Sequence, residues 1–337
     1  MDDQVDVGDA EDLAETAFGV VGHADRLSGE RDQNFRITTA DGDRYLLKVG
    51  SSAEDPAVTD FQTRALLHLA AADPGLPAPR VLPARDGTVS FLWRNGGAAR
   101  AVRLLSFLDG VPLAERVADV GVLWRVGEAL ARMDLALRRF GHPADRHELH
   151  WDLQHAARLA ARLPEVADVA LRDLAGGGLR LFSERAAPRL PSLRAQVIHN
   201  DLNPHNVLVS PDPPHRVTGL LDLGDAVRAP LIDEVAVAAA YHVDQGDDPL
   251  GRAAALVGGY HAVLPLSEDE ISLLAPLIAG RLATTIIIAS LRAAKHPHNS
   301  AYILKNLPAA VRGLESLGRL GERASARGLS LRLDLGP

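Results

Sequence analysis

The stretch that decides the fold runs from Gln196 to Glu234 and begins QVIHNDLNPHNVLVS, at residues 196–210. After a proline-rich turn it continues RVTGLLDLGDAVRAPLIDE, at residues 216–234. Short aliphatic runs that are bounded by turn residues predict buried strands. Polar residues stand at the ends of these runs, so we expect functional side chains on loops that a rigid sheet holds in place.

The spacing of these polar residues is that of a phosphoryl-transfer site. His199, Asp201 and Asn206 fit the pattern H-x-D-x-x-x-x-N, and Asp222 with Gly224 follows as D-x-G. We expect Asp201 to be the general base that orients a substrate hydroxyl. Asn206 and Asp222 are the expected ligands of Mg²⁺, a cation that prefers oxygen donors.

A polar turn between two strands is the alternative interpretation of residues 201–206, because Asn, Asp and Pro all favour turns. The second carboxylate argues against it, since Asp222 follows Asn206 by sixteen residues at the end of another aliphatic run. The complete pattern therefore favours a catalytic hairpin.

Composition limits the classes of protein to consider. The chain has 337 residues, 36 Lys and Arg against 44 Asp and Glu, a net charge of −8 and no cysteine. This length predicts two lobes with a core in each. The negative charge argues against a general affinity for nucleic acid or anionic membranes, and the lack of cysteine excludes disulfides and thiolate chemistry. The N-terminus lacks a signal-peptide pattern and no apolar run reaches eighteen residues, so we expect a cytoplasmic protein.

A hairpin is predicted near the N-terminus. Strands at residues 35–38 and 45–49 flank Asp41 and Gly42, a favoured turn pair. In kinases such a hairpin covers the nucleotide phosphates and its lysine binds them, which makes Lys48 the expected phosphate ligand. A solvated strand lysine is the alternative, but the position of Lys48 ahead of the catalytic stretch favours the functional role.

The turn before this hairpin has a single glycine rather than a glycine-rich loop. Gly29, Arg31 and Asn34 are the candidates there for contacts to the nucleotide, although Arg31 would also suit a surface position. A helix predicted at residues 55–72 carries Gln62 where protein kinases use a glutamate to pair with the lysine. We expect Gln62 to hydrogen-bond to Lys48; an exposed helix glutamine is the alternative.

The rest of the pattern predicts an α+β protein with two lobes. Residues 1–106 are expected to form an N-lobe with an antiparallel sheet and a helix, and residues 107–337 a mainly helical C-lobe with the catalytic hairpin. An amphipathic helix is predicted at residues 11–23, and the helical stretch 153–189 is expected to break at the glycines 176–178.

Together these motifs resemble the aminoglycoside phosphotransferase and choline kinase superfamily, small-molecule kinases with a protein-kinase-like fold, over nearly the whole chain. The residues that carry the resemblance are Lys48, His199, Asn200, Asp201, Asn206, Asp222, Leu223, Gly224 and Asp225. Further stretches resemble the hydroxylysine kinase branch, namely residues 29–35, 131–134, 150–153 and 231–234. Asn200, Leu223 and Gln62 depart from the residues that many relatives have, Gly, Phe and Glu respectively.

This resemblance implies a reaction. A γ-phosphoryl group would pass from ATP or GTP, with Mg²⁺, to the hydroxyl of 5-hydroxylysine or a related amino alcohol. An aminoglycoside or other antibiotic is the alternative acceptor. A nucleotide-binding module without catalysis is a second alternative, against which the complete set of Lys48, Asp201, Asn206 and Asp222 argues.

An acceptor of this kind needs charged partners in the protein. The candidates for binding its ammonium group are Asp225, Asp233 and Glu234. The last two also suit the first turn of a helix, where carboxylates complement the macrodipole. An amino-acid acceptor also needs a cation for its carboxylate, and the candidates are Arg228, Arg281 and Arg292.

Overall fold

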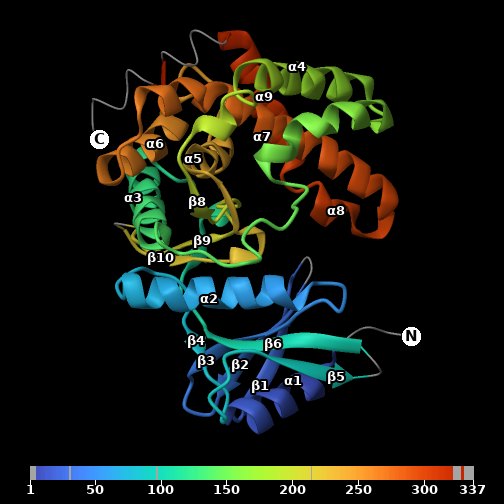
Figure 1. Ribbon diagram of the computed structural model, residues 1–337, viewed down its shortest axis with the longest axis vertical. Helices are drawn as coiled ribbons and strands as arrows, with labels where there is room; N and C mark the ends of the chain where they lie inside the picture. Colours follow the sequence, from blue (N-terminus) through green and yellow to red (C-terminus); the bar gives the residue numbers. More distant parts are fainter. Residues whose placement is uncertain (1–4, 30–31, 96–97, 214, 322–327, 330–337) are drawn as a thin grey trace.

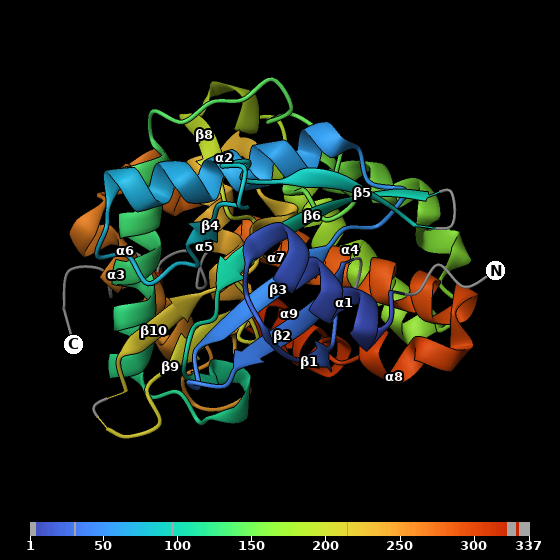
Figure 2. The same ribbon diagram turned by 90° about the horizontal axis from the view of Figure 1, so that it is seen from below.

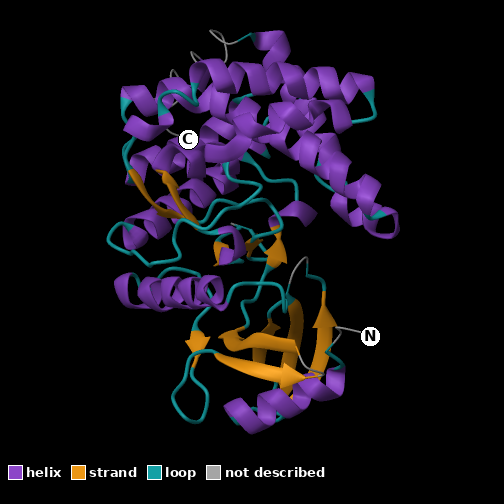
Figure 3. Ribbon diagram, turned by 45° about the vertical axis from the view of Figure 1, so that its right-hand side comes forward, coloured by secondary structure: helices purple, strands orange, loops and turns teal. Residues whose placement is uncertain are grey.

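The computed structural model describes residues 5–29, 32–95, 98–213, 215–321 and 328–329 (Figure 1). A mainly β part comes first, and a mainly helical part follows from about Ser106 onward (Figure 3). This is the α+β arrangement that the sequence predicts.

An antiparallel sheet forms the N-terminal part. Its strands are β1 (Gly22–Leu27), β2 (Gln33–Thr39), β3 (Arg44–Val49), β4 (Val81–Leu82), β5 (Phe91–Asn95) and β6 (Ala98–Ser106). The spatial order is β1-β2-β3-β6-β4, and β5 pairs with β6. Gly42, with φ of 87°, makes the predicted turn between β2 and β3. Helix α1 (Val7–Leu13) packs against the sheet, and α2 (Pro56–Ala72) lies between the sheet and the helical part (Figures 1 and 2).

The N-terminal helix differs from its predicted range of 11–23. Helix α1 is followed by a wider π-helical turn at Ala14–Phe18, and β1 begins at Gly22. Gly19 takes a left-handed φ of 74° at the end of that turn. A left-handed residue ends a helix, and the residues after it pair with β2 instead.

The helical part contains α3 (Val120–Leu137), α4 (Val169–Arg185), α5 (Leu231–Ala240), α6 (Gly251–Val263), α7 (Glu268–Lys295), α8 (Ser300–Ile303) and α9 (Leu307–Leu320). Short 3₁₀ segments lie at Leu113–Glu115, Leu153–Glu165, Leu190–Ser192, Leu223–Asp225 and Pro297–Asn299. The predicted break at glycines 176–178 is wrong, because these residues lie inside α4. A Cβ at Gly178 would lie 3.0 Å from the carbonyl oxygen of Ala279 on α7, so this glycine permits close helix packing.

Five short strands support the catalytic hairpin: β7 (Val111–Pro112), β8 (Ala195–Ile198), β9 (Val207–Val209), β10 (Val217–Leu220) and β11 (Val227–Pro230). β9 lies between β10 and β7, while β11 pairs with β8. The backbone N–H of Leu221 donates to the carbonyl of Asn206 over 2.8 Å. These pairings hold the loop after β8 beside the segment after β10.

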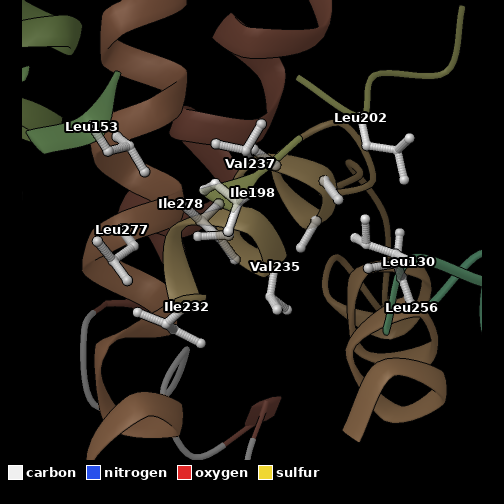
Figure 4. Packing of buried hydrophobic residues seen from close by; sticks show 14 of the residues in the cluster. Leu130, Leu153, Ile198, Leu202, Ile232, Val235, Val237, Leu256, Leu277 and Ile278 are labelled. Carbon is white, nitrogen blue, oxygen red and sulfur yellow. The ribbon is translucent and has the colours of Figure 1, made fainter. Parts of the chain in front are cut away.

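Two hydrophobic clusters stabilise the molecule. The smaller lies between the sheet and α1, and the larger surrounds α5 and α7 (Figure 4). Phe61 of α2 belongs to the larger cluster and stacks on Phe140 with ring centroids 5.9 Å apart. Among the described helices, α7 is long and apolar enough to cross a membrane, but it is mostly buried and we interpret it as a core helix.

Candidate active site

His199 joins the two halves of the catalytic hairpin. Its Nε2 lies 2.7 Å from the carbonyl oxygen of Leu221, and its Nδ1 lies 3.2 Å from the backbone nitrogen of Asp201. A carbonyl can only accept and a backbone N–H can only donate, so the imidazole carries its proton on Nε2. The neutral ring thereby fixes Asp201 relative to the segment that leads into Asp222.

Glu234 holds the backbone of the catalytic loop from the first turn of α5. Its Oε2 accepts hydrogen bonds from the backbone N–H groups of His199 and Asn200, the latter at 3.1 Å. Asn200 has a left-handed φ of 65°, the conformation that glycine takes most easily. Burial raises the pKa of Glu234. The expectation that Glu234 meets a substrate ammonium is therefore wrong, because its side chain is buried against this loop.

Both carboxylate oxygens of Asp201 have partners. Oδ2 accepts from the amide of Asn203 at 2.9 Å and from that of Asn206 at 3.3 Å. Oδ1 lies 2.8 Å from Nη2 of Arg281. Burial raises the pKa of Asp201 to about 7 against the opposing charge of Arg281. A carboxyl group with this pKa is matched to accepting a proton near neutral pH.

Lys48 reaches the hairpin from β3. Its Nζ lies 3.3 Å from Oδ1 of Asp222 and 3.2 Å from Oδ2 of Asp32. The charge of Lys48 lowers the pKa of Asp222 to about 2. Burial acts to lower the pKa of Lys48, but Asp222 and Asp32 raise it overall, so the lysine is charged. Asp32 was not among the residues predicted from the sequence.

The expected contact between Gln62 and Lys48 is replaced by another. Gln62 Oε1 accepts from Nη2 of Arg103 at 2.6 Å, and its Nε2 lies 3.4 Å from the carbonyl oxygen of Gly224. Arg103 is the cross-strand neighbour of Lys48 on β6 and lies 3.8 Å from Asp32. The register of β3 against β6 places Arg103 there, and a sequence pattern does not reveal that register.

The other candidates for the nucleotide lie near the start of β2. A Cβ on Gly29 would lie 2.3 Å from the carbonyl oxygen of Asp32 and 2.7 Å from Nδ2 of Asn34, so only glycine fits this turn. Asn34 faces Lys48 across β2 and β3, and its buried Oδ1 has no partner among the described residues. Arg31 lies outside the described residues. Contacts of Gly29 and Asn34 with a nucleotide remain predictions.

The residues that were predicted to bind the acceptor differ in their surroundings. Arg228 is engaged elsewhere: its Nε lies 2.8 Å from Oδ2 of Asp145 and its Nη2 3.2 Å from the carbonyl oxygen of Phe140. Asp233 is fully buried, and burial raises its pKa well above the ordinary value. Arg228 therefore has a structural position, contrary to expectation. Both carboxylate oxygens of Asp233 have no partner among the described residues, and its role in binding an ammonium remains a prediction. Asp225 is half-buried in the turn after Asp222, and its role in binding an ammonium remains a prediction.

The hairpin also has donors that fit magnesium. The side-chain amide nitrogen of Asn206 donates a hydrogen bond to the backbone carbonyl of Asp201 at 2.8 Å, so the side-chain oxygen of Asn206 can bind a cation. Asp222 is half-exposed and ionised. Within the described residues no group of three or more His, Asp or Glu side chains is placed to hold a metal. Two protein oxygens fit Mg²⁺, which commonly keeps waters and substrate phosphates as its other ligands.

Known proteins match this chain over most of its length. Hydroxylysine kinase from Mus musculus is 28% identical and the match covers 93% of this chain and 89% of that protein. Homoserine kinase from Acidiphilium cryptum is 31% identical over 75% of each chain. The structure of a microcompartment-associated aminopropanol kinase has a TM-score of 0.74 at 20% identity and covers 96% of this chain and 100% of that one, which shows the shared fold.

A family model gives the assignment. The model described as the phosphotransferase enzyme family, APH, matches residues 24–266, which include most of the sheet, Lys48 and the whole catalytic hairpin. The resemblance to aminoglycoside phosphotransferases that the sequence motifs predict is thereby confirmed. The chain belongs to the phosphotransferase enzyme family.

Proposed function

We propose that this protein is a cytoplasmic kinase that transfers the γ-phosphoryl group of ATP or GTP to a hydroxyl of an amino alcohol or hydroxy amino acid, with 5-hydroxylysine as the first candidate. The observation that carries the proposal is the arrangement of Asp201, Asn206 and Asp222 on one hairpin with Lys48 beside it. This arrangement supplies a base, two metal ligands and a phosphate ligand in one place.

In the proposed reaction, the acceptor hydroxyl oxygen forms a bond to the γ-phosphorus as the bond from that phosphorus to the β,γ-bridging oxygen breaks. Asp201 orients the hydroxyl and takes its proton. Lys48 binds the phosphates of the donor. Asn206 and Asp222 would hold Mg²⁺, which would supply positive charge next to the phosphate oxygens. Positioning and electrostatics therefore supply most of the acceleration.

The relatives support an acceptor that carries both an amine and a hydroxyl. Hydroxylysine kinases and homoserine kinases are among the similar sequences, and an aminopropanol kinase is among the similar structures. Each of these named substrates is a small amino alcohol or hydroxy amino acid. Antibiotic kinases share the fold, as with a spectinomycin phosphotransferase at a TM-score of 0.59 and 8% identity, and an antibiotic is the alternative acceptor.

A nucleotide-consumption assay tests the proposal. ATP and GTP are each combined with Mg²⁺ and with 5-hydroxylysine, homoserine, choline, ethanolamine or an aminoglycoside. We expect turnover with hydroxylysine to exceed that with the others. Turnover only with aminoglycosides would support the antibiotic alternative, and nucleotide binding without turnover of any acceptor would support a non-catalytic module.

The variant Asp201→Asn tests the base. It keeps the side-chain volume and loses the carboxylate, so we expect kcat to fall by about 10²- to 10⁴-fold. The dissociation constant of the nucleotide, measured by calorimetry, should stay near that of the wild type because Asp201 is assigned to the acceptor. Full activity in this variant would remove Asp201 from the mechanism.

A further inference from the structure

Arg281 is a buried cation next to the proposed base. It lies on α7, outside the catalytic hairpin, and its side chain is only 2% exposed. The rings of Trp151 and Tyr241 lie 5.5 and 5.9 Å from the centre of its guanidinium. Nη1 donates to the carbonyl of Trp151 at 3.1 Å, and Nη2 donates to Asp201 at 2.8 Å and to the Tyr241 hydroxyl at 3.0 Å.

These contacts leave the hydrogen-bonding capacity of Arg281 incompletely used. A guanidinium has five N–H groups in a fixed fork that matches the two oxygens of a carboxylate. Nε of Arg281 is buried and has no partner among the described residues. Asp201 contacts the fork through one oxygen and one nitrogen only, because its other oxygen is held by Asn203. A buried N–H without an acceptor is unfavourable and indicates that a ligand can complete the site.

We propose that Nε and Nη2 of Arg281 bind the carboxylate of the acceptor, which makes a hydroxy amino acid the substrate class of this enzyme. This inference rests on the proposed kinase function. Arg281 lies within hydrogen-bonding distance of Asp201, so an acceptor would place its carboxylate on the arginine and its hydroxyl on the aspartate next to it.

Binding a carboxylate at Arg281 requires that one of its present contacts be replaced. The Tyr241 hydroxyl is neutral and is the weaker of the two acceptors on Nη2, so it is the contact that a carboxylate replaces. Because the side chain of Arg281 is only 2% exposed, a ligand reaches Nε only after a neighbouring side chain moves, and Trp151, whose ring lies 5.5 Å from the centre of the guanidinium, is half-buried. An aminoglycoside carries hydroxyl and ammonium groups but no carboxylate, so it cannot form this charged pair with the guanidinium.

A matched pair of acceptors tests the proposal without any mutation. 5-Hydroxylysine and its primary amide differ in the carboxylate alone, as do homoserine and its amide. Hydrogen bonds to charged groups predict that wild-type kcat/KM is about 10- to 100-fold higher for the acid than for the amide. Equal kcat/KM for acid and amide would overturn the inference. Turnover of ethanolamine or choline but of none of these four compounds would overturn the inference and leave the proposed kinase function, whereas turnover of no acceptor at all would reject both.

Variants then assign the effect to a residue. Arg281→Lys keeps the charge and loses the fork, while Arg281→Met loses both. We expect the acid-to-amide ratio of kcat/KM to fall toward one in both, and a partial loss of folded protein cancels in that ratio. Arg189→Met is the control, since Arg189 is an exposed arginine that pairs with the exposed Asp269.

Two outcomes decide the role of Arg281. A collapse of the ratio in the Arg281 variants, with the ratio unchanged in Arg189→Met, supports carboxylate binding. An equal loss of kcat for acid and amide, with the ratio kept, would show that Arg281 only positions Asp201, and would overturn the proposal.

Discussion

Nζ of Lys48 lies 3.3 Å from Oδ1 of Asp222, although 174 positions separate the two residues in the chain. This ion pair joins the N-terminal sheet to the catalytic hairpin. Asp32, 3.2 Å from the same nitrogen, adds a second carboxylate. The lysine is therefore oriented toward the place where nucleotide phosphates and a cation are expected, before either is bound.

Replacing Lys48 tests this arrangement. Lys48→Met removes the cation and leaves Asp222 and Asp32 facing the phosphates, so we expect nucleotide affinity to fall at least about tenfold, as for loss of a charged hydrogen bond. Calorimetric titration with ATP and with GTP measures this. Arg44→Met on the same strand is the control, because Arg44 pairs with the exposed Asp109. Unchanged affinity in Lys48→Met would contradict the assigned role.

Glu234 gives a prediction about the catalytic loop. Glu234→Leu leaves the backbone N–H groups of His199 and Asn200 without an acceptor, and buried unsatisfied groups destabilise a protein by roughly 1–3 kcal/mol each. We expect the free energy of unfolding in urea to fall by about 3 kcal/mol, and kcat to fall because Asp201 follows directly. Glu234→Gln keeps an oxygen acceptor and should lose less. Equal stability of Glu234→Leu and wild type would exclude this role.

The parts of the site that lie close in sequence were predictable, because Asp201, Asn206 and Asp222 share one hairpin whose spacing carries the chemistry. Contacts between distant segments were not. Gln62 hydrogen-bonds to Arg103 and not to Lys48, because the register of β3 against β6 places Arg103 beside it, and no local sequence pattern predicts that register.

The burial of individual polar side chains was also not predictable from the sequence. From its sequence position Glu234 is a plausible substrate ligand, but every residue of α5 is buried once the helix packs against α6 and α7, and Glu234 instead holds the backbone of the catalytic loop. The direct contact of Arg281 with Asp201 likewise depends on the packing of α7.

His242 predicts a dependence of stability on pH. Burial lowers its pKa from 6.5 to about 3, with the charge of Arg252 adding to the effect. The unfolded chain takes up the proton near pH 6.5 and the folded protein only near pH 3, so this contribution is complete above pH 6.5 and is lost as the pH falls. At pH 5 the loss is about 2 kcal/mol for this group.

His242→Leu should abolish that loss. The difference between the unfolding free energies at pH 7 and pH 5, measured in urea, should be about 2 kcal/mol smaller in this variant than in the wild type. His298→Leu, at an exposed position, should leave the difference unchanged. The same pH dependence in His242→Leu and wild type would show that other groups cause the acid sensitivity.

Gly259 gives a prediction about packing beneath the hairpin. A Cβ at this position of α6 would lie 2.0 Å from the carbonyl oxygen of Trp124 on α3, and Gly127 of α3 approaches Leu256 of α6 in the same way. Backbone atoms meet the added methyl, so the helices must separate. Although alanine favours a helix by about 1 kcal/mol over glycine, we expect Gly259→Ala to lower the unfolding free energy by about 1–3 kcal/mol.

Gly318→Ala in α9 is the control. No atom lies within 4 Å of a Cβ added there, so this variant should raise the unfolding free energy by about 0.5–1 kcal/mol. Urea denaturation of both variants measures this contrast, and stabilisation by Gly259→Ala would show that the two helices do not pack this closely.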